Sequence, residues 1–121
     1  MRLRIDFAGK VFLADLEDTP TARAILKALP FESTAQTWGE EVYFSTPVNV
    51  KLEAGAQQVV EAGTVCFWTD GDAIALPWGR TPISTDGRPK LASPCNILGR
   101  LDNFKGLKAV QSGDKVKVEK A

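Results

Sequence analysis

The sequence contains no histidine among its 121 residues, and this absence excludes the most common forms of catalysis. Without an imidazole, a serine or cysteine triad lacks its usual general base, and zinc and non-haem iron sites lose their usual ligand. No other motif in the chain identifies a catalytic centre. We therefore expect a binding function, with no catalytic residues, no metal and no cofactor.

Cysteine is also scarce, because the chain has only Cys66 and Cys95. The two stand apart and form no CxxC pattern, which argues against a zinc or redox motif and against a disulfide scaffold. We interpret Cys66, next to small residues in a predicted strand, as a small buried apolar group. These features favour a cytoplasmic protein with reduced thiols.

Excess charge and long apolar runs are missing as well. Fifteen basic and fifteen acidic residues cancel, so the field that attracts nucleic acid or anionic lipid is not evident. The apolar runs are too short to span a membrane, and the charged start RLRIDF interrupts any signal peptide. We expect one globular domain over residues 1–121, with no nucleic-acid or membrane partner; the oligomeric state stays open.

The first third of the chain predicts a hairpin and a helix. Alternating apolar residues in 2–7 and in 10–16 predict two strands joined at Ala8-Gly9. Residues 19–29 predict a helix in which Thr19 is the cap and Pro20 occupies the first helical position. The helix should bury the apolar residues that recur at helical spacing, which are Ala22, Ile25, Leu26 and Leu29.

The rest of the chain has mainly β patterning. Short alternating runs at 31–38, 40–45 and 48–52 predict strands, and a proline-containing loop at 83–95 precedes strands at 96–101 and 115–119. A type I′ turn at Asp70-Gly71 would pair 65–68 with 73–76. One face of this hairpin would carry Val65, Phe67, Ile74 and Leu76, and the other Cys66, Trp68, Ala73 and Ala75. The small alanines on the second face should leave room above the sheet.

Three segments carry a resemblance to a known family: ALPFESTAQTWGEEVYFS, GTVCFWTDGDAIALPWGRTPIS and NILGRLDNFKGLKAV. Their order and spacing are similar to a small family of uncharacterised prokaryotic cyclophilin-like proteins, over nearly the whole chain. The resemblance implies a closed antiparallel β-barrel with one helix capping an end. About eight predicted strands and one clear helix agree with that fold, because closure removes exposed edges.

The resemblance does not imply an activity. True cyclophilins are proline isomerases with an arginine in a Phe-His-Arg segment, and the nearest segment here is VYFSTP, which lacks an arginine. Their Gln-Gly-Gly-Asp segment is missing too. We therefore favour a binding module for a small molecule or an extended peptide; the alternative is a peptidyl-prolyl cis-trans isomerase with a non-standard active site.

The candidate ligand-binding residues centre on ALPWGRTPIS, residues 75–84, where Trp78 and Arg80 lie on a loop stiffened by two prolines. In one interpretation this loop is a corner, with Trp78 packed over the barrel end. In the other, Trp78 is partly exposed at a concavity, toward which Arg80 also points. The groove would then be lined by Trp38, Glu41, Tyr43, Trp68, Trp78 and Arg80.

The missing arginine generates a first prediction. The purified protein should accelerate cis-to-trans conversion of a short Xaa-Pro peptide little or not at all above the slow spontaneous rate. A protease-coupled isomerisation assay measures this. Robust catalysis at micromolar protein would contradict the prediction and support the isomerase alternative.

Overall fold

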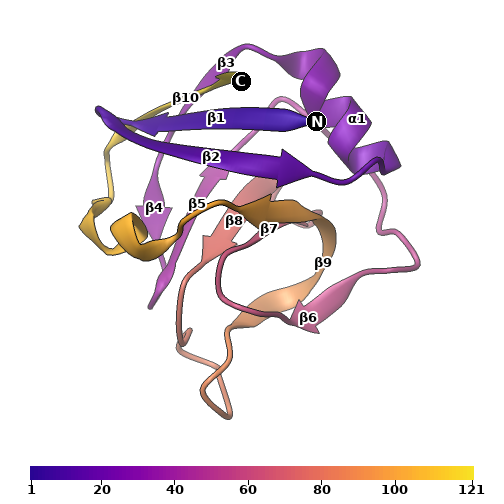
Figure 1. Cartoon of the computed structure of the whole chain (residues 1–121). Coiled ribbons are helices and arrows are strands. Elements are labelled where there is room, and N and C mark those ends of the chain that lie inside the picture. Colours follow the sequence, from indigo (N-terminus) through magenta and orange to yellow (C-terminus); the bar gives the residue numbers. More distant parts are fainter.

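The computed structural model describes residues 1–121 and is built mainly from antiparallel strands, as Figure 1 shows. It contains one α-helix, α1 (Pro20–Ala28), and one short 3-10 helix, η1 (Lys105–Ala109). No helix has the length and apolar composition needed to cross a membrane. The strands are β1 (Arg2–Phe7), β2 (Lys10–Leu16), β3 (Phe31–Thr34), β4 (Gln36–Thr37), β5 (Glu41–Ser45), β6 (Gln57–Val59), β7 (Thr64–Trp68), β8 (Ala73–Pro77), β9 (Lys90–Leu101) and β10 (Lys115–Lys120).

The strands follow one continuous path in the order β3-β10-β1-β2-β9-β7-β8-β5-β4, and β6 pairs with β9 off this path. Every pairing is antiparallel. Backbone hydrogen bonds do not join the two ends of the path, although the hydroxyls of Ser33 in β3 and Ser45 in β5 lie 3.2 Å apart. The mainly β antiparallel fold is therefore confirmed, whereas closure of the barrel is not.

The N-terminal hairpin forms as predicted. β1 and β2 pair from Arg2 opposite Asp15 to Phe7 opposite Lys10, leaving a two-residue turn. Both turn residues have positive φ, 51° at Ala8 and 97° at Gly9, as a type I′ turn requires.

The helix also forms as predicted, and the expected face is buried in part. The Thr19 hydroxyl accepts a hydrogen bond from the Ala22 amide at 3.2 Å, and Pro20 begins the helix. Ala22 and Ile25 are fully buried, together with Thr21. Leu26 and Leu29 are only half-buried, although both pack against the hydrophobic core, so the helix is turned slightly toward Thr21 relative to the expectation. The helix covers one end of the curved sheet (Figure 1).

The strand predicted at 48–52 is absent, because a buried asparagine takes the place of a strand partner. The Asn96 side chain accepts a hydrogen bond from the Glu53 amide at 2.7 Å and donates to the Lys51 carbonyl at 3.0 Å. It also donates to the Thr21 hydroxyl at 2.9 Å, and the Glu53 carboxylate accepts the Thr21 amide at 3.0 Å. This satisfied network ties the loop to the start of α1.

The hairpin of β7 and β8 has the predicted register but a different turn. Cys66 pairs with Ala75 and Trp68 with Ala73. Within the four-residue loop only Asp72 has a positive φ, 49°, so the turn is not type I′. Gly71 instead leaves room for the Trp68 ring, because a Cβ at this position would overlap that ring.

β9 is longer than the strand predicted at 96–101, because it begins at Lys90 and includes part of the expected loop. It pairs with β6, β7 and β2 in turn. A register shift opposite Val65 and Cys66 marks a bulge. Pro94 is exposed and lies where the pairing with β6 is irregular, so its missing N–H costs little.

Two apolar clusters lie on opposite faces of β7 and β8. The larger contains 22 buried residues, including Val65, Phe67, Ile74 and Leu76, and forms the main core beneath α1. The second cluster is small, and its buried members are Val60, Cys66, Ala75, Leu91 and Cys95. This second face holds the candidate site.

Close backbone contact at Gly99 gives a test of the fold. A Cβ at Gly99 would overlap the Asp15 carbonyl oxygen of β2, and a backbone atom cannot move aside cheaply. We expect Gly99→Ala to lower the free energy of unfolding by about 1 to 3 kcal/mol or more. Gly87→Ala is the control, because nothing lies within 4 Å of its added methyl group. Equal losses for both variants in chemical denaturation would contradict the close approach.

Candidate functional site

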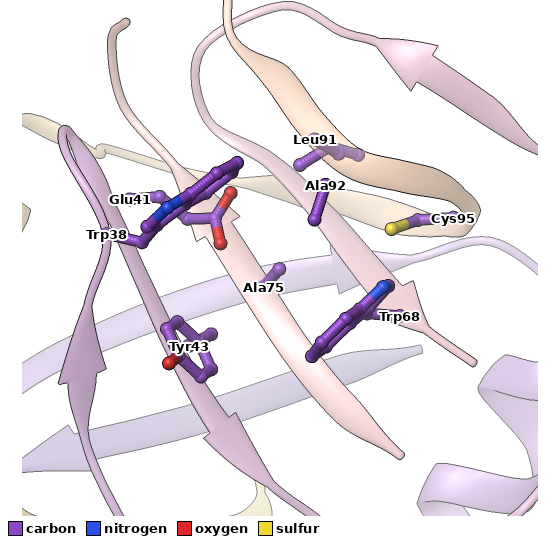
Figure 2. Close-up of a pocket in the computed structure, with 8 residues that line it drawn as sticks. All are labelled: Trp38, Glu41, Tyr43, Trp68, Ala75, Leu91, Ala92 and Cys95. Atoms are coloured by element: carbon purple, nitrogen blue, oxygen red, sulfur yellow. The ribbon is translucent and has the colours of Figure 1, made fainter. Parts of the chain in front are cut away.

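A pocket of about 240 Å³ opens on the second face of the sheet, and Figure 2 shows the side chains around it. Its walls come from β5, β7, β8, β9 and the residues just before β5. Seven of its eight lining residues are hydrophobic. The lining residues are Trp38, Glu41, Tyr43, Trp68, Ala75, Leu91, Ala92 and Cys95.

Small side chains on the floor create this hollow. Ala75 pairs directly with Tyr43 of β5 on one side and with Cys66 of β7 on the other, so the three share one face. In the adjacent rows Trp68 lies opposite Ala73, and Glu41 lies opposite Pro77. A carboxyl group and an indole thus stand on two sides of an alanine floor. The alternation in the hairpin predicted the indole and the alanines.

Two tryptophans and a tyrosine form the aromatic walls. In Figure 2, Trp38 and Trp68 lie on opposite sides of Ala75. The Trp68 indole donates to the Ser93 hydroxyl at 2.8 Å, and that hydroxyl donates to Asp70 Oδ2 at 3.2 Å. The Tyr43 ring meets Trp68 edge to face, with centroids 6.5 Å apart. Hydrogen bonding and packing therefore hold the Trp68 ring before any ligand arrives.

Glu41 is the only acidic residue of the pocket, and it is unusual. Its side chain is 5% exposed, and its Oε1 has no hydrogen-bond partner. Burial among apolar walls raises the pKa of Glu41 to about 7, because desolvation penalises the charged form. An unpaired carboxyl group in a concave site is costly for folding and is typical of functional positions.

The two thiols near the pocket are protonated and inert. Burial, with smaller contributions from Glu41 and Asp70, raises the pKa of Cys95 to about 12. Burial also raises the pKa of Cys66 well above its usual range, in accord with its interpretation as an apolar group. No three His, Cys, Asp or Glu side chains gather in a way that could hold a metal ion.

Trp78 and Arg80 do not line the pocket, so the expectation that they share a concavity with Trp68 or Tyr43 is wrong. Trp78 is an even number of residues from Ile74 and Leu76, so its side chain lies on the same face as theirs. It therefore packs against the main core. Arg80 is exposed, and its guanidinium donates to the Ser84 carbonyl at 3.3 Å. Trp78 is partly exposed, so its packing agrees with the corner interpretation of the loop at 78–82 only in part.

The structure brings together four of the six predicted residues: Trp38, Glu41, Tyr43 and Trp68. Their role in ligand binding stays a prediction. The β9 wall, Leu91, Ala92 and Cys95, was missed because its prolines led us to expect a loop. Leu91, Cys95 and Ile97 are separated by even numbers of residues, as apolar residues on one face of a strand are, and this spacing was the available sequence signal.

The raised pKa of Glu41 gives a prediction for stability. The folded state binds this proton more tightly than the unfolded state, where the pKa is near 4.5, so Glu41 lowers stability as the pH rises from about 4.5 to about 7. Glu41→Gln removes this loss. Its free energy of unfolding, relative to the native protein, should increase by about 3 kcal/mol between about pH 4.5 and pH 8. A difference that stays constant over this range in urea denaturation would contradict the buried carboxyl.

Comparisons with known proteins agree with the architecture. The chain is similar to the solution structure of the hypothetical protein AF2241 from Archaeoglobus fulgidus, with 46% sequence identity and a TM-score of 0.86. The match covers 100% of this chain and 95% of the other. No curated protein matches the chain significantly. The Cyclophilin-like family model matches residues 1–119, which is almost the whole chain, and the protein therefore belongs to the cyclophilin-like family.

Proposed function

We propose that the protein is a binding module and that its pocket takes a small, largely apolar molecule. The observation that carries the proposal is the unpartnered, buried Glu41 carboxyl among apolar walls. A ligand that supplies a hydrogen-bond donor would satisfy Oε1 and cover the aromatic rings at once.

The size of the pocket favours a small ligand. Drug-sized ligands occupy pockets of about 300 to 1,000 Å³, and the volume here is about 240 Å³. The space suits a single ring or a short branched chain, either as a free molecule or as one side chain of an extended peptide. We favour the free molecule because the pocket holds only about 240 Å³.

The walls are also ordered in advance, which supports binding. Trp68 is fixed by Ser93, and the Tyr43 hydroxyl donates to Gln36 Oε1 at 3.2 Å. Side chains that are already held lose little entropy when a ligand arrives.

The residues of the pocket support binding over catalysis. Glu41 is its one group that could transfer a proton near neutral pH, and no second acid or base lines the pocket to complete a reaction. No arginine lines it either, and proline isomerases of this fold use one to polarise the prolyl amide.

Benzyl alcohol, a neutral one-ring probe, tests the proposal by NMR. The protein has three tryptophans, so its ¹H–¹⁵N spectrum should contain three indole signals. The signals of Trp38 and Trp68 should shift with a Kd on the order of 1 mM, as weak binding of so few atoms implies. The Trp78 signal should stay unchanged, since its ring packs against the main core.

A blocking variant provides the control. Ala75→Leu places a larger side chain on the pocket floor and should abolish the shifts, whereas Ala54→Leu in an exposed loop should leave them intact. If the Trp38 and Trp68 signals do not respond in the native protein, or respond equally in Ala75→Leu, the pocket is not a binding site for such molecules.

A further inference from the structure

One buried polar atom on the pocket wall has no hydrogen-bond partner. The Trp68 indole donates to Ser93, the Tyr43 hydroxyl to Gln36, and the Cys95 thiol to the Ser93 carbonyl at 3.4 Å. Among the buried polar atoms only Glu41 Oε1 lacks a partner, and it is an acceptor when ionised. The ionised form of Glu41 therefore calls for a ligand that brings a donor.

The same wall contains no positive charge. Neither lysine nor arginine is among the eight lining residues, so nothing in the pocket compensates an ionised Glu41. The neighbouring carboxylate, Glu40, accepts the Arg80 amide at 2.9 Å and belongs to the exposed corner. A positive charge on the ligand would compensate Glu41, whereas an anion would be repelled by it.

Aromatic rings surround the place where that charge would lie. Trp38 and Trp68 stand on either side of the floor, and Tyr43 lies between β4 and β8 on the same face (Figure 2). The face of an aromatic ring attracts a cation, tryptophan most strongly, and the attraction grows when water is excluded. Two indoles, a phenol ring and one carboxyl group form the kind of cage that holds alkylated ammonium groups.

We infer that the ligand is an organic cation, an amine that carries one or more N–H bonds and an apolar substituent of about one ring in size. The inference rests on the proposed function of the pocket. In the bound state an N–H donates to Glu41, the aromatic rings face the charged nitrogen, and the apolar substituent fills the space toward Leu91 and Ala92.

Other occupants fit the site less well. A metal ion needs several oxygen or nitrogen ligands, and the pocket offers one carboxyl group. A neutral alcohol can donate to Glu41, but it leaves the charge of the carboxylate uncompensated and makes no cation–π contact. The amine satisfies the buried carboxylate and contacts the aromatic rings of the pocket.

The inference sets a direction for pH dependence. Binding of the amine requires the ionised carboxylate, so affinity should rise as the pH increases through about 7, the pKa of Glu41. The other titratable groups facing this space are Tyr43 on β5, Cys95 on β9 and Cys66 on β7; the pKa values of both thiols are raised, so neither ionises in this range. A neutral ligand that accepted a hydrogen bond from the protonated Glu41 carboxyl would show the opposite trend.

Benzylamine and benzyl alcohol form a matched pair of probes, because they differ in one heavy atom and in charge. We expect benzylamine to bind at least about tenfold more tightly than benzyl alcohol at about pH 8, by NMR titration of the Trp38 and Trp68 indole signals. Its affinity should fall about tenfold or more at about pH 5.5, where Glu41 is protonated.

Variants of two adjacent carboxylates separate charge recognition from shape. Glu41→Gln should reduce benzylamine affinity at least about tenfold and change benzyl alcohol affinity by less than about threefold. Glu40→Gln should change neither. These losses, with the pH trend above, support the inference.

The results also distinguish failure of the inference from failure of the proposed function. If benzyl alcohol binds as tightly as benzylamine, or if Glu41→Gln weakens both equally, the preference for a cation is overturned while the pocket remains a binding site. If neither probe shifts the indole signals, both proposals are overturned.

Discussion

Strict alternation of side chains along β5, β7 and β8 is the constraint on which both the core and the pocket depend. Large residues such as Phe67, Ile74 and Leu76 point to one face and build the main core. Cys66, Ala73 and Ala75 point to the other face, and they are too small to fill it. The sheet can therefore keep a hollow on one side because its stability comes from the other side. A one-residue slip in register would destroy both at once.

The hollow lowers the stability of the fold, mainly because the Glu41 carboxyl is buried there without a hydrogen-bond partner. Glu41 pairs with Pro77 and is flanked by aromatic rings. At this position a leucine or a glutamine would stabilise the fold more than a glutamate whose carboxyl group has no partner. Carboxyl groups with strongly shifted pKa values are concentrated at functional sites. The rest of the pocket shows no comparable defect, since Trp68, Tyr43 and Cys95 all have partners. The missing partner is thus localised at one atom, Oε1.

The sequence allows prediction of the features that depend on local pattern. The N-terminal hairpin, the capped helix and the small-residue face of β7 and β8 follow from periodicity and turn chemistry, and they form as expected. The loop between β7 and β8 is an exception, because it is not the predicted type I′ turn. The misses have non-local causes. The loop at 48–52 is held by Asn96, which lies far away in the chain, and β9 passes through Pro94 because its pairing is irregular there. Such partners cannot be recognised from neighbouring residues.

The corner at 78–82 shows why motif and site differ. Trp38-Gly39 and Trp78-Gly79 look alike in the sequence, yet the first tryptophan lines the pocket and the second packs against the main core. The corner still contributes to the pocket through its backbone. The Trp78 amide donates to the Glu40 carbonyl at 2.8 Å, and the Glu40 amide donates to the Arg80 carbonyl at 2.9 Å. These bonds hold the chain between Trp38 and Glu41, so the corner positions the aromatic wall and the carboxyl group without touching a ligand itself.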